Sequence, residues 1–191
     1  LLAGRICVDG REVSIRHPQD AMRCGIALVN EDRKGCGLLQ DLSIKQNIAV
    51  SNLHQMKTAL GLVDVKKEET LSREMTQQLR VKCTGVEQLV RYLSGGNQQK
   101  VVLSKWLLRD PKILILDEPT RGIDVGSKDE IYEMIARLAK QGMAILLLSS
   151  ELAEVISMAH RILVLKDGQP RGELAGEGAT QDEIMMIAVE E

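Results

Sequence analysis

Two acidic residues, Asp117 and Glu118, directly follow an apolar run of Ile and Leu at residues 113–116. A short continuous run of this kind is typical of a strand buried on both faces. Ligands of such sheets bind beyond the carboxyl ends of the strands. Asp117 could hold Mg²⁺ through a water molecule, and Glu118 could orient or deprotonate an attacking water. The same acidic pair could equally form a simple turn, so the pattern alone leaves both interpretations open.

A second candidate is the turn Ser94-Gly95-Gly96. It precedes a helix that we expect to run to about Arg109, with Pro111 ending it. A helix N-terminus offers free N–H groups and the positive end of the helix dipole, which suits a phosphate. A glycine-rich cap without any ligand is the alternative, and the turn alone does not decide between the two.

Local signals predict the elements ahead of these motifs. The expected elements are a hairpin turning at Asp9-Gly10, a short helix from Pro18 to about Gly25, a buried strand at 26–30, a polar loop at 31–38, and a short helix at 43–50 with Ser43 and Gln46 as its capping box. Residues 54–93 are charged and favour helix, with an approximate apolar stripe of Val65, Leu71, Met75 and Leu79. We interpret them as a helical insert between two parts of a sheet.

Strands and amphipathic helices alternate after the insert. The expected elements are a strand at 113–116, a helix beginning near Ser127 with Glu130 completing a capping box, a strand at 144–148, a helix at 151–159, a strand at 161–165, a turn at Asp167-Gly168, and a last short helix capped by Thr180 and Glu183. This alternation predicts an α/β fold with a largely parallel sheet covered on both faces.

Composition limits the function. The chain has 191 residues, enough for one domain or one domain with a small appendage, and a net charge of −2, so bulk attraction to nucleic acid or to an anionic membrane is not expected. With two Tyr, one Trp and no Phe, it is poorly equipped to stack bases. The four Cys and three His show no metal-ligand spacing, and no stretch predicts a membrane span or a signal peptide. The first residue is not Met and the sequence starts within a strand-like segment, so we expect a fragment.

Taken in order, LSGGNQQK, a helix, ILILDEPT and the Asp124 of RGID resemble the ATP-binding cassette (ABC) family of transporter ATPases. EDRKGCGL, DEPTRGIDVG and LLLSSELAEV are most similar to the second cassette of monosaccharide importers of the ribose, galactose and xylose type. The resemblance implies a P-loop-NTPase-like fold with an N-terminal antiparallel hairpin, formed by a single cassette over 1–191 with a helical signature subdomain at 40–95.

The resemblance also implies a set of site residues and partners. The cofactors would be ATP and Mg²⁺, with Asp117 holding the metal through water and Glu118 catalytic. ATP would contact Ser94, Gly95, Gly96, Asn97, Gln98 and Asp124. The partners would be a second ABC cassette, an integral-membrane permease docked on residues 31–90, and indirectly a periplasmic or extracellular sugar-binding protein. Nucleic acid is not an expected partner. The implied location is peripheral, on the cytoplasmic face of the inner membrane.

Three departures from an active cassette matter. The phosphate-binding loop GxxxxGK[ST] is absent from the 191 residues, and GIDVGSK at 122–128 has the wrong spacing and follows the Walker B strand. Glu31 stands at the Q-loop position, where a carboxylate would repel a γ-phosphate unless a cation intervened. Ser150 stands at the position of the switch histidine and cannot supply the charge of an imidazole. We therefore expect this chain to offer its signature to ATP held by another cassette.

Three functions follow from these features. The first is a transport module that couples ATP hydrolysis to sugar import, with the chain inactive by itself. The second is a non-catalytic or regulatory cassette that acts only through partner interaction. The third, a cassette ATPase of DNA repair or translation, is disfavoured by the few aromatic residues and the lack of a basic patch.

Overall fold

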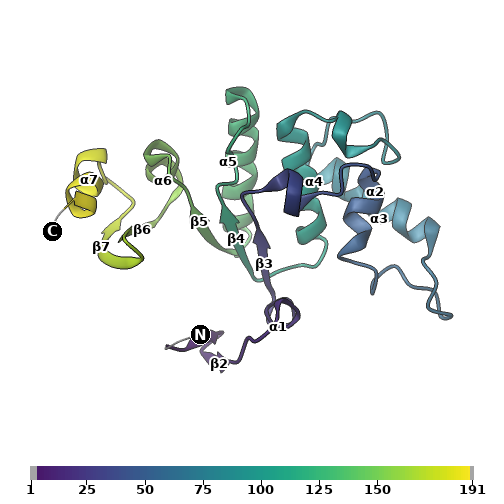
Figure 1. Cartoon of the computed structure of the whole chain (residues 1–191), viewed down its shortest axis with the longest axis horizontal. Coiled ribbons are helices and arrows are strands. Elements are labelled where there is room, and N and C mark those ends of the chain that lie inside the picture. The colour runs from purple at the N-terminus through teal and green to yellow at the C-terminus, as the bar shows by residue number, and fades with distance from the viewer. Residues whose placement is uncertain (1–3, 190–191) are drawn as a thin grey trace. The chain divides into compact units, whose positions relative to one another are not determined.

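The computed structural model describes residues 4–189, which divide into two compact units, one ending at Leu146 and the other beginning at Leu147. Within the described residues, the strands form a two-stranded sheet β1-β2, a three-stranded sheet in the order β3-β4-β5, and a two-stranded sheet β6-β7. Figure 1 labels β2 to β7 along the chain. None of the helices between residues 4 and 189 combines the length and apolarity needed to cross a membrane.

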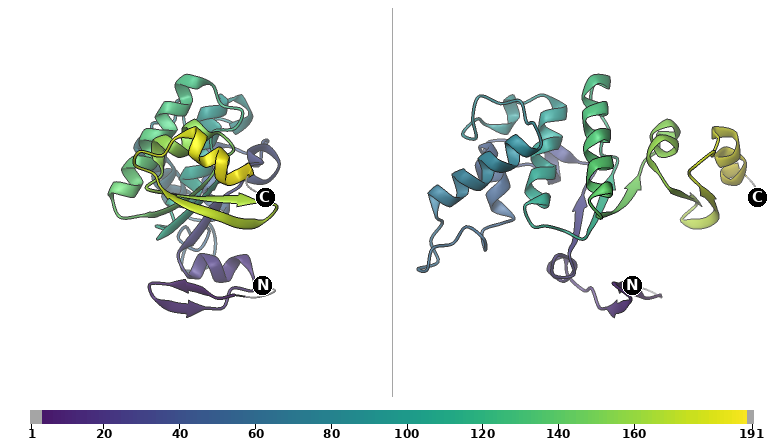
Figure 2. Two further views of the ribbon diagram at one scale, coloured as in Figure 1. Left: turned by 90° about the vertical axis from the view of Figure 1, so that its left-hand side faces the viewer. Right: turned by 180° about the vertical axis from the view of Figure 1, so that it is seen from behind.

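The N-terminal hairpin and the first helix lie ahead of the parallel sheet. β1 (Ile6–Val8) pairs antiparallel with β2 (Arg11–Val13), and the turn between them has positive φ at Asp9 (52°) and Gly10 (72°). Positive φ at both central residues is what a two-residue hairpin turn requires, which explains the Asp-Gly pair. α1 (Pro18–Arg23) begins with the predicted proline and contacts β3 (Figure 2).

The central sheet is built on a parallel pair. β3 (Ile26–Val29) pairs with β4 (Ile113–Asp117) in the register Ile26 to Ile113, so both strands bring their carboxyl ends to the same edge. β5 (Ala144–Leu148) lies on the other side of β4. One face of the β3–β4 pair is fully packed, with Ala27, Val29, Leu114 and Leu116 buried. The opposite face is more open, and Leu28 is 46% exposed on it.

A cluster of helices forms the middle of the first unit. α2 (Ile44–Val50), α3 (Val65–Gln78) and α4 (Gly95–Leu107) contact one another, and α4 also contacts β3 and α5 (Val125–Lys140). A short 3-10 turn, η2 (Val90–Tyr92), leads into α4. The predicted capping box of α2 is confirmed, because Ser43 Oγ accepts from Gln46 N and Gln46 Oε1 accepts from Ser43 N.

The second unit has its own small core. It contains α6 (Leu152–Met158), the antiparallel pair β6 (Arg161–Lys166) and β7 (Gln169–Ala175), and α7 (Gln181–Val189). Ile162 and Val164 of β6 and Ile184 of α7 are buried together. Thr180 and Glu183 form the predicted capping box, with Glu183 Oε2 accepting from Thr180 N at 2.8 Å.

The structure differs from the sequence predictions in several elements. The polar stretch expected as a loop contains one π-helical turn, η1 (Arg33–Gly37), in which Cys36 N and Gly37 N both donate to Asp32 O. The helix expected near Ser127 begins two residues earlier, at Val125, because the Asp124 carboxylate accepts from Ser127 N and supplies the cap. Glu130 therefore does not cap this helix.

Two further predictions need correction. Val65 was expected in the apolar stripe of α3, but it is 59% exposed at the start of the helix, and of the four stripe residues only Met75 and Leu79 are buried. The strand at 161–165 was expected to continue the parallel sheet, but β6 pairs antiparallel with β7, which the sequence analysis did not predict. Pro170 and Gly172 weaken the strand signal of β7, and the register shift beside Leu165 accommodates the proline.

Candidate functional site

The predicted signature turn forms the N-terminus of α4. Ser94 is the N-cap residue, with extended backbone angles (φ −63°, ψ 160°), and its Oγ accepts from Asn97 N at 3.5 Å and Asn97 Nδ2 at 2.8 Å. Gly95 and Gly96 are the first two helical residues, so their N–H groups have no acceptor within the helix. Ser94 is exposed and Gly95 is partly exposed, so this end of the helix is accessible to a ligand.

The two glycines allow close approach by two different groups. A Cβ built on Gly96 would lie 2.5 Å from Ser127 Cβ and 2.7 Å from Ser127 Oγ, so the start of α4 packs directly on the start of α5. A Cβ on Gly95 would lie 3.3 Å from both Arg33 Nη2 and Gly122 O. Gly96 is therefore needed for packing between helices, whereas Gly95 faces a cation and a carbonyl group.

Arg33 was not predicted as a site residue. Its side chain is partly buried, its Nε has no hydrogen-bond partner, and burial lowers the pKa of the guanidinium. No ion pair to Arg33 is present within residues 4–189. A guanidinium beside the positive end of a helix is electrostatically unfavourable unless an anion stands between them. This arrangement therefore favours an anionic ligand at the signature turn.

The acidic pair lies at the carboxyl edge of the parallel sheet. Asp117 is the last residue of β4, and Glu118 follows in a left-handed conformation with φ of 46°. Both side chains are partly exposed, and Thr120 in the next turn is buried. A non-glycine residue with positive φ is held there by its surroundings, and such residues cluster at functional sites.

Glu31, the residue at the predicted Q-loop position, forms an ion pair with Arg121. Glu31 follows β3 and Arg121 follows β4, so the pair links the two loops that leave neighbouring strands at one edge of the sheet. A carboxylate at this position would repel a γ-phosphate unless a cation offset its charge, and the Arg121 guanidinium is such a cation. Both side chains are exposed, so we expect only a small contribution to stability.

A magnesium site would need oxygen ligands from these residues. Within residues 4–189, no group of three or more His, Cys, Asp or Glu side chains could hold a metal ion. Mg²⁺ in nucleotide sites is usually bound by one or two carboxylates, with substrate phosphates and water completing the coordination. Asp117, at the carboxyl end of β4, is a donor of that kind. The residues present therefore fit a metal that arrives with a nucleotide.

The remaining signature residues have structural partners. Asn97 Oδ1 accepts from Lys82 N at 2.8 Å, which leaves its side chain only partly exposed. Gln98 is 4% exposed, and its Nε2 donates to Val90 O at 3.0 Å. The burial of Gln98 argues against its expected contact with ATP, because its amide is turned toward η2.

Asp124, expected to contact ATP, is the N-cap of α5. Hydrogen bonds from the Ser127 side chain and backbone hold the pKa of Asp124 below its ordinary value. The residue is exposed and close in sequence to Gly122, whose carbonyl oxygen faces Gly95. The structure thus brings the segment 122–127 against the signature turn.

Ser150, at the predicted switch position, belongs to the second unit. It is exposed and follows β5 by two residues. Its neighbour Ser149 accepts from Glu151 N and donates to the Glu154 carboxylate, so Ser149 fixes the start of α6. The structure thus joins Ser94, Gly95 and Gly96 to the 122–127 segment, and Glu31 to the segment after Asp117.

Comparison with known proteins gives the family of this chain. The family model described as ABC transporter matches residues 2–121, and the chain therefore belongs to the ABC transporter family. It is 49% identical over 187 residues to a ribose import ATP-binding protein of Streptomyces coelicolor, covering 98% of this chain and 36% of the relative. A xylose import ATP-binding protein of Geobacillus kaustophilus is 49% identical over 185 residues, covering 97% of this chain and 36% of the relative.

A third relative is a ribose import ATP-binding protein of Rubrobacter xylanophilus, 45% identical over 186 residues, which cover 97% of this chain. The chain spans 37% of the length of that relative. The matched regions of all three relatives cover 97–98% of this chain, so they span the signature turn and the acidic pair. The predicted resemblance to sugar-importer cassettes is confirmed.

Solved structures confirm the fold class. The ADP conformation of an ATP-binding cassette of an ABC transporter superposes with a TM-score of 0.77 at 18% identity, covering 99% of this chain and 78% of that chain. A dimeric post-hydrolysis cassette bound to ADP and Pi superposes with a TM-score of 0.74 at 19% identity, covering 93% and 75% of the two chains. The α/β, P-loop-NTPase-like prediction therefore holds.

Proposed function

We propose that this chain is an ATPase component of a sugar importer, in which its signature turn contacts ATP held mainly by another cassette. The proposal is supported by the 45–49% identity to relatives named as ribose and xylose import ATP-binding proteins. It is also supported by the similarity to a dimeric cassette bound to ADP and Pi. Such a chain would couple ATP binding and hydrolysis to transport through partner proteins.

The observation that carries the proposal is the Arg33 guanidinium against Gly95 at the start of α4. Two positive features, the helix N-terminus and a guanidinium with no ion pair among residues 4–189, converge on a turn that is accessible at Ser94. A triphosphate would supply the missing negative charge, and the backbone N–H groups of Gly95 and Gly96 would donate to it. Ser94 Oγ and the Asn97 amide would complete the polar surface.

In the site that this chain forms itself, we propose weaker chemistry. Asp117 would hold Mg²⁺ through water, and the metal would supply charge neutralisation when bound with nucleotide. Glu118 would orient or deprotonate the attacking water, whereas Asp124 would act outside this site and face the ATP held by the neighbouring cassette, beside the signature turn. Glu31 at the Q-loop position, even when paired with Arg121, and Ser150 in place of an imidazole make this site the less effective of the two.

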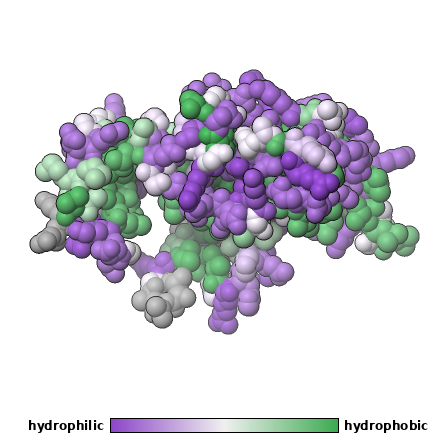
Figure 3. Space-filling view, turned by 45° about the horizontal axis from the view of Figure 1, so that its top comes forward, coloured by the Kyte–Doolittle hydropathy of each residue, from purple (hydrophilic) through white to green (hydrophobic). Residues whose placement is uncertain are grey.

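The partners proposed are a second ABC cassette, a membrane permease and, indirectly, a sugar-binding protein, at the cytoplasmic face of the inner membrane. The segment between α2 and α3, together with the first residue of α3, supports a docking role within residues 31–90. Leu60 is 87% exposed, Leu62 and Val65 are also exposed, and the apolar surface at the right-hand end of Figure 3 lies over this segment. An exposed apolar cluster of this kind marks an interaction surface.

The test is ATP turnover by the transporter assembled with this chain carrying Arg33→Gln, with Lys34→Gln as the control. Arg33 has a desolvated guanidinium without an ion pair, so its removal should leave folding stability unchanged or raise it. Turnover should fall by about tenfold or more, because a hydrogen bond to a charged group contributes about 1.5–3 kcal/mol. Lys34 is exposed and its variant should keep turnover.

The proposal fails if Arg33→Gln retains wild-type turnover in a correctly assembled transporter. It also fails if the assembled wild-type protein takes up sugar without any dependence on ATP. The second result would instead favour the non-catalytic, regulatory interpretation of the chain.

A further inference from the structure

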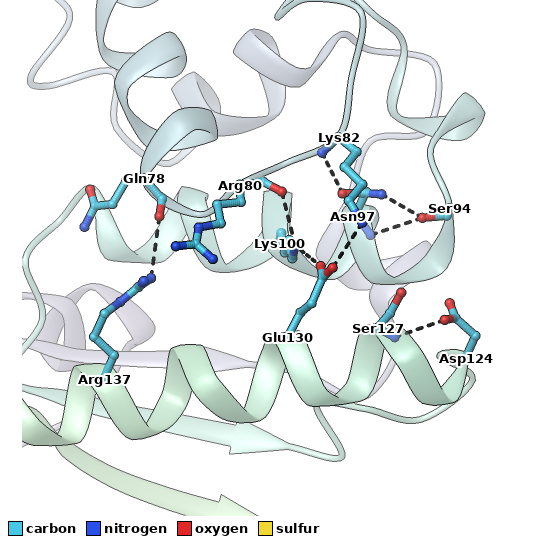
Figure 4. A network of polar contacts seen from close by, with 10 residues as sticks. All are labelled: Gln78, Arg80, Lys82, Ser94, Asn97, Lys100, Asp124, Ser127, Glu130 and Arg137. Carbon is cyan, nitrogen blue, oxygen red and sulfur yellow. Dashed lines mark hydrogen bonds and ion pairs between the residues drawn. The ribbon is translucent and has the colours of Figure 1, made fainter.

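An ion pair between a buried lysine and a half-exposed glutamate joins α4 to α5, one helical turn beyond the Ser94–Gly96 turn. Lys100 is 3% exposed, and its Nζ donates to Glu130 Oε2 at 2.5 Å and to Arg80 O at 3.1 Å. The other oxygen of Glu130 accepts from Lys82 Nζ at 3.0 Å. Figure 4 shows Lys100 and Glu130 pointing toward each other from the two helices, with Lys82 reaching the same carboxylate.

Two hydrogen bonds from the Lys100 ammonium group fix its orientation. A buried ammonium group is costly unless its protons are accepted, and here a carboxylate and a backbone carbonyl accept two of them. Hydrogen bonds from Lys100 and then Lys82 lower the pKa of Glu130, so the carboxylate is charged at neutral pH. Lys82 is exposed, whereas Lys100 is enclosed, so the geometry depends mainly on the Lys100–Glu130 contact.

Two contacts one turn apart fix one helix against the other. Gly96 and Lys100 are four residues apart and lie on the same face of α4, and Ser127 and Glu130 are three apart on one face of α5. Gly96 packs on Ser127 at the ends of the helices, and Lys100 binds Glu130 one turn further in. A single contact would act as a pivot, but two contacts set the direction of α4 relative to α5 as well as its distance.

Both helices begin at predicted site residues. α4 begins directly after Ser94, and α5 begins directly after its cap Asp124. We propose that Lys100 and Glu130 are positioning residues that hold the Ser94–Gly96 turn at a fixed place relative to Asp124, so that both can face one ATP molecule. This inference rests on the proposed function. Neither residue touches the nucleotide, and the effect is transmitted through the helix N-termini.

The experiment compares ATP KM, kcat and unfolding stability for Glu130→Met, the double variant Lys100→Met with Glu130→Met, and Arg137→Met in the assembled transporter. Arg137 is the matched control, because its Nη2 donates to Gln78 O at 3.5 Å and ties α5 to α3 far from the helix N-termini. We expect Glu130→Met to lower stability, because it leaves the buried Lys100 ammonium without its carboxylate. It should also raise KM at least fivefold while kcat changes less than twofold, as loss of a binding interaction predicts.

The double variant separates positioning from simple stability. Removing the buried Lys100 ammonium together with Glu130 should restore stability, because no uncompensated buried charge remains. We expect stability to recover while KM stays raised, since two flexible Met side chains cannot set the helix direction. Arg137→Met should change KM less than twofold.

Two results would overturn the inference: a wild-type KM in folded Glu130→Met, or recovery of KM together with stability in the double variant. Failure of the proposed function is a separate result, because it appears as normal turnover in Arg33→Gln. If Arg33→Gln is impaired while the double variant has normal KM, only the positioning role is wrong.

Discussion

Replacing Gly96 with Ala should destabilise the chain by an amount that the contact with Ser127 determines. The added Cβ would lie 2.5 Å from Ser127 Cβ and 2.7 Å from its Oγ. Carbon atoms in good contact are about 3.5–4.0 Å apart, so α4 and α5 must separate or Ser127 must shift. Since both helices are fixed again at Lys100 and Glu130, they cannot separate freely.

The expected magnitude follows from two opposing effects. Overpacking a well-packed contact costs about 1–3 kcal/mol, whereas a Gly-to-Ala change inside a helix gains about 0.8–1.0 kcal/mol. The net loss for Gly96→Ala is therefore about 0–2 kcal/mol. Gly126→Ala provides the control, since the nearest atom to its new Cβ is Asp124 Oδ1 at 3.7 Å. It should gain helix propensity without strain, and Gly95→Ala should fall between the two.

Urea unfolding of the purified chain, followed by circular dichroism, measures the series. The propensity gain is shared, so the difference between Gly126→Ala and Gly96→Ala isolates the strain of about 1–3 kcal/mol. Ser127→Gly should cost less in the Gly96→Ala background than in the wild type, because it removes the clashing atoms. Equal stability of Gly96→Ala and Gly126→Ala, with no coupling to Ser127, would refute the close approach of the two helices.

Three further predictions follow from the same structure. The 191-residue chain by itself should bind Mg-ATP only weakly, because it contains no GxxxxGK[ST] loop to hold the β- and γ-phosphates; a micromolar Kd by calorimetry would contradict this. In an assembled transporter, the exposed Cys36 should react with a permease-side crosslinker, as docking on residues 31–90 requires; reaction only at sites outside that range would contradict the docking surface. The lowered pKa of Glu130 means that its stabilisation is present above the ordinary Glu value of 4.5 and is lost as pH falls through the lower folded pKa. Glu130→Gln should therefore lose less stability than wild type as pH falls from 5 to 3, measured by urea unfolding, and parallel pH profiles would contradict that assignment.

Local signals in the sequence predicted local structure well. The Asp9-Gly10 turn and the Ser43 capping box depend on residues within four positions of each other, and both are present. The helix start at Asp124 was missed because Asp124 and Ser127 are both good N-cap residues, and only tertiary structure decides between them. The β7 strand was missed because Pro170 and Gly172 are rare inside strands.

Contacts between distant segments could not be predicted in this way. Arg33 and Gly95 are far apart in sequence, and nothing in the polar stretch 31–38 indicates that its π-helical turn brings a guanidinium to the signature. The Lys100–Glu130 pair has the same origin, since it depends on the packing of α4 against α5. Gln98 was expected at the nucleotide because of its place in the motif, but nearly all of α4 from Gln98 to Lys105 is buried, so sequence pattern did not define its accessible face.

The most direct test of the central claim compares Gly95→Asp with Glu118→Gln in the transporter assembled with this chain, by steady-state ATP hydrolysis and sugar uptake. An Asp Cβ at Gly95 would lie 3.3 Å from Arg33 Nη2 and Gly122 O, so it fits with a shift of a few tenths of an ångström. Its carboxylate would neutralise Arg33 and repel a phosphate at the start of α4.

Because the signature is proposed to serve the more effective site, Gly95→Asp should abolish most turnover and uptake. Glu118→Gln should cost less, since it alters the site already weakened by Glu31 and Ser150. Both variants are first checked for folding and assembly. If Glu118→Gln proves the more damaging, the site formed by this chain's own acidic pair is the working one, and the proposed role of the signature turn is contradicted.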